Sequence, residues 1–191
     1  PANTLSLHDA LPIFSPLKEA QQQLQLSEEK FAKAFHSSPD GLLITRESDG
    51  LLIEVNEGFS RITGYNSARS LDRSTLDLGI WVDLNERAKM IERLKRDGFV
   101  RDFSTHIRRR DGQIRLCEMS ARLLPIGGED CLLTIARDIT ERHQMQEKLQ
   151  LAATVFESTA EGVLITDTQQ NISAVNRAFT EITGYSEEEA L

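Results

Sequence analysis

The sequence predicts an α+β protein with a five-stranded antiparallel sheet, helices on one face of that sheet, and a linker helix at each end. Two observations predict this fold class. Two short apolar segments with strand character precede a helical region and three follow it, and turn signals such as Asp-Gly separate neighbouring strands. This order of strands, helices and strands is typical of an antiparallel sheet whose helices gather on one side.

The N-terminal part is expected to contain a leader and a linker helix. Residues 1–15 lack the basic start and continuous apolar core of a signal peptide, and the run TLSLHDALPI resembles translated sequencing-adapter DNA. We therefore expect residues 1–15 to be a non-native or disordered leader. Residues 16–35 are expected to form the linker helix, because Leu24, Phe31 and Phe35 fall on one helical face.

Turn and cap residues define the first two strands and the short helix after them. Residues 42–45 and 51–55 are mostly apolar and are separated by a tight-turn sequence. Asn56 is a favourable N-cap for the helix that follows. Gly64 supplies the left-handed residue with which that helix ends.

The longest helix of the domain is expected to run from Leu84 to Asp97. Asp83 followed by Glu86 resembles a capping box at its start, and Gly98 ends it. The spacing of the apolar residues predicts that one stripe faces the core, made of Leu84, Ala88, Ile91 and Leu94.

Three strands are expected over residues 99–109, 114–124 and 131–137. The second of them carries apolar side chains on both faces, so one face needs cover besides the helices of the domain. The linker helix or a partner subunit can supply that cover. We therefore expect self-association as a homodimer.

The C-terminal linker, residues 141–157, has the pattern of a short coiled coil. Its apolar residues follow four-three-four spacing and comprise Met145, Leu149, Ala152 and Phe156. We expect a weak seam of this kind to support dimerisation by the flanking domains.

The chain also repeats itself. The residues Phe35, Gly41, Leu43, Ile44 and Thr45 recur as Phe156, Gly162, Leu164, Ile165 and Thr166, and the run Ile62-Thr63-Gly64-Tyr65 recurs as Ile182-Thr183-Gly184-Tyr185. We expect one complete domain at residues 36–140 and the N-terminal part of a second, truncated domain at residues 158–191.

Charge and composition disfavour several classes of protein. The net charge of -8 argues against nucleic acid as a partner, and the basic run 108–110 is expected to be a solvated turn. The two cysteines have no metal-ligand spacing, which argues against a disulfide framework or a metal site and fits a cytoplasmic location. No segment is long and apolar enough to cross a membrane, so we expect no membrane contact by this chain.

Several motifs together resemble the PAS family, in a tandem arrangement found in the sensory regions of bacterial signalling proteins. They are Ser38-Pro39-Asp40-Gly41, Val55-Asn56-Glu57-Gly58-Phe59, Ile62-Thr63-Gly64-Tyr65, Arg110-Asp111-Gly112, and the closing run from Ala136 to Arg142. The resemblance implies a five-stranded sheet and helices that enclose a small cavity. It also implies a sensory and dimerisation module, not an enzyme, placed upstream of an output domain in the same polypeptide. Such an output is commonly a histidine kinase or a cyclic-di-GMP enzyme.

The same resemblance supplies candidates for signal transmission and for ligand contact. The helix that begins at Asp138, Ile139 and Thr140 is similar to the family's signalling helix, so these three residues are the transmission candidates. The cavity candidates are Phe59, Ile62, Tyr65, Trp81, Ile91, Leu94, Phe103, Thr105, Ile107, Leu116, Glu118 and Leu133. A plain hydrophobic core has the same composition, so the list alone does not separate a cavity from a filled core.

Cofactor requirements narrow the ligand classes. Haem is disfavoured because the helix at residues 84–97 contains no histidine, and a light-oxygen-voltage flavin is disfavoured because residues 66–78 contain no cysteine. A redox flavin flanked by Trp81 and Asn85 stays open. A small organic ligand, or none, is the expectation. The alternative to ligand sensing is a ligandless domain that dimerises and relays strain along its linker helices. No catalytic motif is found.

Overall fold

The computed structural model describes residues 7–191, with the backbone alone described for residues 7–15 and Ala68. The chain divides into two compact units, with the boundary between Ile139 and Thr140. The expected leader lies partly outside the described residues. From Leu7 onward it is helical and continuous with the predicted linker, so helix α1 (Leu7–Ser37) begins earlier than the helix predicted at 16–35.

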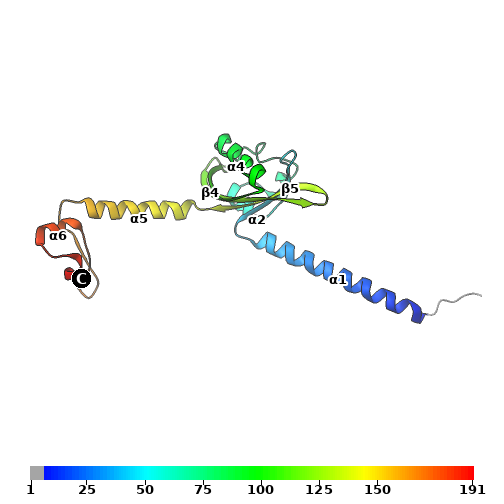
Figure 1. Ribbon diagram of the computed structural model, residues 1–191, viewed down its shortest axis with the longest axis horizontal. Helices are drawn as coiled ribbons and strands as arrows, with labels where there is room; N and C mark the ends of the chain where they lie inside the picture. The colour runs from blue at the N-terminus through cyan, green and yellow to red at the C-terminus, as the bar shows by residue number, and fades with distance from the viewer. Residues whose placement is uncertain (1–6) are drawn as a thin grey trace, which may run out of the picture. The chain divides into compact units, whose positions relative to one another are not determined.

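Over its described residues, 7–139, the first unit holds one sheet and four helices. In chain order its elements are α1, β1 (Gly41–Arg46), β2 (Leu52–Val55), α2 (Glu57–Thr63), α3 (Ser67–Ser70), α4 (Leu84–Asp97), β3 (Phe99–Arg108), β4 (Ile114–Ile126) and β5 (Glu129–Asp138). All strand pairs are antiparallel and the order across the sheet is β2-β1-β5-β4-β3. This confirms the predicted fold class, with α4 lying over one face of the sheet (Figure 1).

Helix α2 is held at both ends by the residues that the sequence indicates. The side-chain oxygen of Asn56 accepts a hydrogen bond from the amide of Phe59 at 2.8 Å. Gly64 has a φ of 74° and donates its amide to the carbonyl of Ser60, which ends the helix. Phe59 and Ile62 are both buried, and α2 packs on β1.

Helix α4 has the predicted bounds but turns a different face to the sheet. Met90 and Leu94 are buried and Arg87 is half-buried, whereas Leu84 and Ala88 are exposed. The predicted stripe was therefore wrong at its N-terminal end. The helix is short, so its orientation is decided by which side chains fit the sheet and not by a long apolar repeat.

The predicted capping box at the start of α4 does not form. Asp83 accepts a hydrogen bond from the amide of Asn85 at 2.8 Å, one residue earlier than a capping box requires. The carboxylate of Glu86 instead accepts a hydrogen bond from the hydroxyl of Thr105 on β3. This bond ties the first turn of α4 to the sheet.

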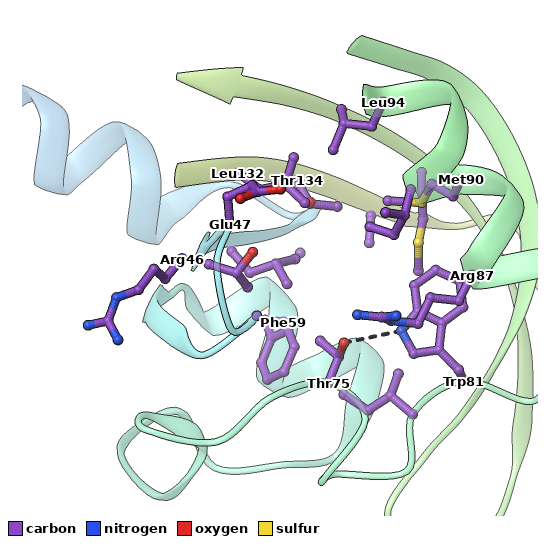
Figure 2. Close-up of a pocket in the computed structure, with 18 of the residues that line it drawn as sticks. Arg46, Glu47, Phe59, Thr75, Trp81, Arg87, Met90, Leu94, Leu132 and Thr134 are labelled. Atoms are coloured by element: carbon purple, nitrogen blue, oxygen red, sulfur yellow. Dashed lines mark hydrogen bonds between the residues drawn. The ribbon is translucent and has the colours of Figure 1, made fainter. Parts of the chain in front are cut away.

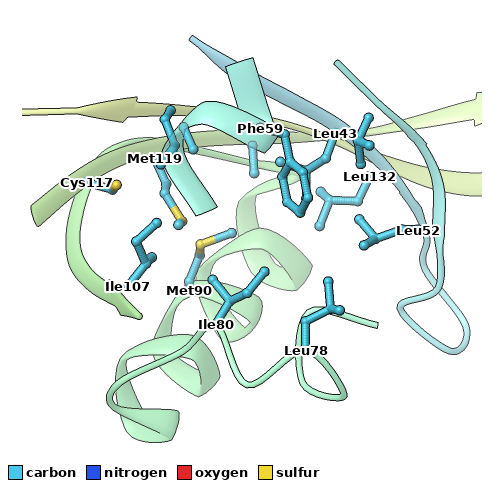
Figure 3. Close-up of a cluster of buried hydrophobic side chains, with 14 of the residues drawn as sticks. Leu43, Leu52, Phe59, Leu78, Ile80, Met90, Ile107, Cys117, Met119 and Leu132 are labelled. Carbon is cyan, nitrogen blue, oxygen red and sulfur yellow. The ribbon is translucent and has the colours of Figure 1, made fainter. Parts of the chain in front are cut away.

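The main core lies between the sheet and the helices that cover it. Figure 3 shows Met90 of α4 and Met119 of β4 pointing toward one another, with Phe59 of α2 farther along the same layer. Cys117 and Ile107 are fully enclosed in this cluster. The inward residues of β4 and β5 alternate with outward ones, as a pleated strand requires.

The opposite face of the sheet is only partly covered. There, Phe35 at the end of α1 packs with Ile44, Cys131 and Leu133 in a second, smaller cluster. Farther across this face, Ile135 remains 39% exposed.

The second unit contains helix α5 (Thr140–Ser158), strands β6 (Leu164–Thr166) and β7 (Ile172–Val175), and helices α6 (Arg177–Thr183) and α7 (Glu187–Ala190). Strands β6 and β7 pair as β1 and β2 do in the first unit. Ile182 is 69% exposed here, whereas its counterpart Ile62 is 7% exposed. The two-stranded sheet therefore leaves much of its apolar surface open.

Within residues 7–191, no helix combines the length and the apolar composition that a membrane span requires.

Candidate ligand-binding cavity

A cavity of about 290 Å³ lies in the first unit, between the sheet and its covering helices. Its walls come from β1, the turn after β1, α2, α4, and the inward faces of β3, β4 and β5. Figure 2 shows the side chains of Phe59, Trp81, Met90 and Leu94 around this space. A space of this size is large enough for about ten water-sized groups at roughly 30 Å³ each.

Six of the twelve cavity candidates line this space. They are Phe59, Ile62, Trp81, Ile91, Leu94 and Ile107. Trp81 is held by a hydrogen bond from its indole nitrogen to the hydroxyl of Thr75 at 3.1 Å (Figure 2). The fixed ring forms one wall. Binding of a ligand by these residues remains a prediction.

Three further candidates lie on the helix-covered side of the sheet but do not reach the cavity. Tyr65 is half-buried and donates its hydroxyl to the carbonyl of Leu78 at 2.6 Å. Phe103 packs beside the core under the guanidinium of Arg93. Thr105 is buried, and its hydroxyl is taken up by Glu86 as described above.

The other three candidates, Leu116, Glu118 and Leu133, lie on the opposite face of the sheet, which corrects their placement. The inward residues of β4 are Cys117, Met119 and their alternates, so Leu116 and Glu118 point the other way. On β5 the inward residues are even-numbered, and Leu133 packs under Phe35. Both strands carry apolar residues on both faces, so the sequence pattern did not define which face is inward.

Several polar residues of the cavity wall were not among the candidates, and two threonines and one arginine stand out among them. Thr45 on β1 and Thr134 on β5 are buried and line the cavity, as does half-buried Arg87 on α4. Threonine and arginine are common at many kinds of position, so the residue type alone does not indicate a cavity wall. Thr45 could have been found from the alternation of β1, in which Gly41, Leu43 and Thr45 share the inward face.

Charged groups gather where the turn after β1 meets α4. Arg46 bonds Asp49 at 2.8 Å, and Lys95 lies 3.8 Å from Glu47. The bond from the Leu51 amide, and then Arg46, lower the pKa of Asp49 below its usual value. Burial lowers the pKa of Arg87 from its usual value, and no carboxylate of the described residues offsets that effect.

The three transmission candidates form the junction between β5 and α5. Asp138 is the last residue of β5, pairs with Cys117 in the strand register and lies 3.9 Å from Arg115. The amide of Ile139 donates to the carbonyl of Leu116 at 2.9 Å. Thr140 begins α5. Their role in transmission remains a prediction.

Neither cysteine nor any described histidine side chain lies in the cavity wall. Cys117 and Cys131 are unpaired and buried on opposite faces of the sheet, and His36, His106 and His143 are exposed. Asn85, the residue considered with Trp81 for a flavin, is exposed and is not among the lining residues. In the described part of the chain, no three His, Cys, Asp or Glu side chains form a group that could hold a metal ion.

Family comparison agrees with this fold and cavity. A PAS-domain profile matches residues 39–141, and a second PAS-domain profile matches residues 150–191. The chain therefore belongs to the PAS family, and it carries two successive PAS matches. This confirms the family predicted from the motifs.

Named relatives are sensor proteins. The chain is 28% identical over 177 residues to the methyl sulfide methyltransferase-associated sensor of Methanosarcina acetivorans, which covers 91% of this chain and 16% of that protein. It is 30% identical over 166 residues to the sensor histidine kinase TmoS of Ectopseudomonas mendocina, covering 80% of this chain and 17% of that protein. The chain thus spans less than a fifth of the length of either relative. It is a sensor module of the signal-transduction type.

A crystal structure of a PAS domain from Colwellia psychrerythraea has the same fold. It aligns with a TM-score of 0.52 at 22% identity and covers 59% of this chain and 97% of the other. This likeness supports the five-stranded sheet with its helices.

Proposed function

We propose that the first PAS unit senses a small organic ligand in the cavity and passes its occupancy through β5 to helix α5. The observation that carries the proposal is that β5 is both a wall of the cavity and the strand that leads into α5. Thr134 and Ala136 line the cavity, and α5 begins at Thr140.

Only a few residues of β5 separate the cavity wall from the start of α5, and the pairing of β5 with β4 fixes their positions. The register pairs Met119 with Ala136, and both line the cavity. Two positions beyond Ala136, Asp138 pairs with Cys117, after which Ile139 bonds the carbonyl of Leu116. A ligand that favours one arrangement of β4 and β5 therefore also favours one position for the start of α5.

The C-terminal end of α5 is bonded to the rest of the second unit in the way that the end of α1 is bonded to the first unit. Asn176, 1% exposed, donates its side-chain amide to the carbonyl of Phe156 at 3.0 Å, as Asn56 does to the carbonyl of Phe35 at 2.9 Å. A displacement of α5 is thus passed to Asn176 of the second unit through this hydrogen bond.

We also propose that the chain dimerises along its linker helices. On α1, Leu17, Leu24 and Phe31 are seven residues apart and each is more than half exposed. On α5, Met145 and Leu149 are 60% and 64% exposed. Such stripes are stable in water when a second helix covers them.

An output domain in the same polypeptide, of the histidine kinase or cyclic-di-GMP class, completes the proposal. One named relative is a sensor histidine kinase, which supports the first of these classes. A cytoplasmic location and the lack of catalytic activity remain part of the proposal. The two free, buried cysteines fit a reducing compartment.

Hydrogen–deuterium exchange of the 191-residue chain tests the sensing function. The probes are octanoate and octan-1-ol, which share a carbon skeleton, with their binding measured by calorimetry. We expect amide exchange in residues 139–158 to change when either probe occupies the cavity. Occupancy with unchanged exchange in this segment, or no binding of either probe, would overturn ligand sensing in favour of a ligandless relay.

A further inference from the structure

Arg87 is a charged residue on the cavity-facing side of α4. It lies one turn before Met90 and Ile91 and lines the same cavity as they do. Figure 2 shows its side chain extending from α4 toward the middle of the cavity beside Trp81, whereas the guanidinium of Arg46 points away. An added Cβ at Gly50 would lie 3.9 Å from a terminal nitrogen of Arg87, so the guanidinium reaches the turn after β1.

The acidic residues of the cavity wall are already paired with other cations. Asp49 is bonded by Arg46, and Glu47 is approached by Lys95. Among the residues that the structure describes, Arg87 makes no side-chain hydrogen bond, ion pair or cation–π contact. The half-buried guanidinium therefore presents donors that no acceptor of the described residues takes up, and these donors are available to an anionic ligand.

The hydroxyls of two buried threonines in the same wall add polar groups to the cavity. Thr45 and Thr134 line the cavity on neighbouring strands β1 and β5, and no hydrogen bond of either hydroxyl is found within the described residues. By contrast, Thr63 and Thr75 in the wall both use their hydroxyls within the protein. The cavity therefore offers the hydroxyls of two buried threonines and the guanidinium of Arg87, beside apolar side chains such as Phe59 and Met90.

We propose that the cavity binds a small organic acid whose carboxylate pairs with Arg87 and whose apolar part packs against Phe59, Trp81 and Met90. The inference rests on the proposed function only in taking the cavity as a ligand site. A single carboxylate matches a single guanidinium with two parallel hydrogen bonds. A doubly charged phosphate would bring a second negative charge close to Glu47 and Asp49, which disfavours it.

Calorimetry on the 191-residue chain tests this assignment with octanoate and octan-1-ol. We expect octanoate to bind at least about tenfold more tightly, because it alone presents a charged acceptor. Arg87→Gln should lower the octanoate affinity by about tenfold or more and leave the octan-1-ol affinity within about twofold. Arg87→Lys, which keeps the charge without the planar fork, should fall between the two.

Lys89→Gln is the matched control, since Lys89 is an exposed cation of the same helix and is not among the lining residues. It should leave both affinities unchanged. Equal affinity for the two probes, equal effects of the Arg87 and Lys89 variants, or no binding of octanoate would overturn the assignment.

The carboxylate site and the sensing function can fail independently of one another. If octanoate binds through Arg87 and exchange in α5 does not change, sensing fails and the carboxylate site stands. If octan-1-ol binds equally well and α5 responds, the carboxylate site fails and sensing stands.

Discussion

At the residue scale, Asn56 joins three segments of the first unit through one buried side chain. Its oxygen accepts from the amides of Leu42 and Phe59, and its nitrogen donates to the carbonyls of Phe35 and Asp40, all at 2.8 to 2.9 Å. The side chain has no exposed surface, and all four of its hydrogen-bonding positions are used. It therefore fixes the end of α1, the start of β1 and the start of α2 at the same point.

Asn56→Ala should destabilise the first unit by at least about 3 kcal/mol, because it strands several buried backbone groups at once. Urea unfolding followed by the fluorescence of Trp81, the single tryptophan of the chain, measures this. Asn176→Ala is the matched control, since it removes the same four-bond arrangement from the second unit. Equal loss of stability in the Trp81 signal for both variants would contradict this assignment.

Burial raises the pKa of the Cys117 thiol to about 12 from 9.0, with Asp138 adding to the shift. Because the folded state holds this proton more tightly than the unfolded state, the thiol's stabilising contribution is present below pH 9 and is lost as the pH rises toward 12. The unfolding free energy of the wild type should therefore fall faster than that of Cys117→Ala above pH 9, by at most about 1.4 kcal/mol per pH unit. Denaturant titrations at a series of pH values measure the difference, and parallel pH profiles would refute it.

The sequence predicted the roles of residues that depend only on their neighbours along the chain. It predicted less well the roles that depend on which face of a strand is inward. Asn56 and Gly64 were predicted as caps because a cap depends on a few neighbouring residues. Leu116 and Leu133 were misplaced because their strands are apolar on both faces, and the packing of α1 and α4 decides which face is inward. Only the assembled fold contains that information.

At the element scale, α4 brings a cation into the cavity because it turns a slightly different face to the sheet than its apolar spacing predicts. Its bounds were predicted from Asp83 and Gly98, but Leu84 is 62% exposed and Arg87 faces the sheet instead. The hydrogen bond between Glu86 and Thr105 anchors the first turn in this orientation. Apolar spacing alone predicts neither this hydrogen bond nor the observed inward face of α4. Arg87 was therefore missed as a site residue.

The hairpin between β3 and β4 is attached to α2 by one arginine of the basic run. Arg109 donates to the carbonyls of Arg61 and Ile62 at 2.6 and 3.0 Å, at the C-terminal end of α2, where a cation is also favoured by the helix dipole. Its exposed neighbour Arg110 contributes a backbone bond to Thr63. The expectation of a solvated turn thus holds for Arg110 and not for Arg109.

Arg109→Gln should lower the unfolding free energy by about 1–2 kcal/mol through loss of these charge-assisted bonds. The neighbouring Arg110→Gln keeps its backbone bond and should change stability by less than about 0.5 kcal/mol. Urea titrations of the two variants decide the point. A larger loss for Arg110→Gln would reverse the roles we assign.

At the scale of the whole molecule, apolar surface remains on both linker helices and on the outer face of the sheet. Ile135 and Phe99 are 39% and 46% exposed on β5 and β3, in addition to the exposed stripe on α1. Stripes and faces of this kind are typical of protein–protein contacts. The proposed dimer interface therefore draws on several elements and not on one alone.

Sedimentation equilibrium of the 191-residue chain should show a dimer at micromolar concentration. Leu24→Glu with Phe31→Glu places like charges in the α1 stripe and should shift the chain to monomer. Gln22→Glu, which adds a charge at an exposed polar position of the same helix, is the control and should leave the dimer intact. A monomeric wild type, or equal dissociation by the control, would contradict the proposed helix interface.

Ligand sensing requires that the cavity bind a small organic molecule, and native mass spectrometry tests this most directly. The 191-residue chain is purified from a bacterial host and then incubated with the small-molecule extract of that host. We predict an added mass that is absent in Ala136→Phe, which fills the cavity from β5, and present in Ile135→Phe, which changes the adjacent outward position. A bare mass for the wild-type chain, or an added mass that survives Ala136→Phe, would contradict the account.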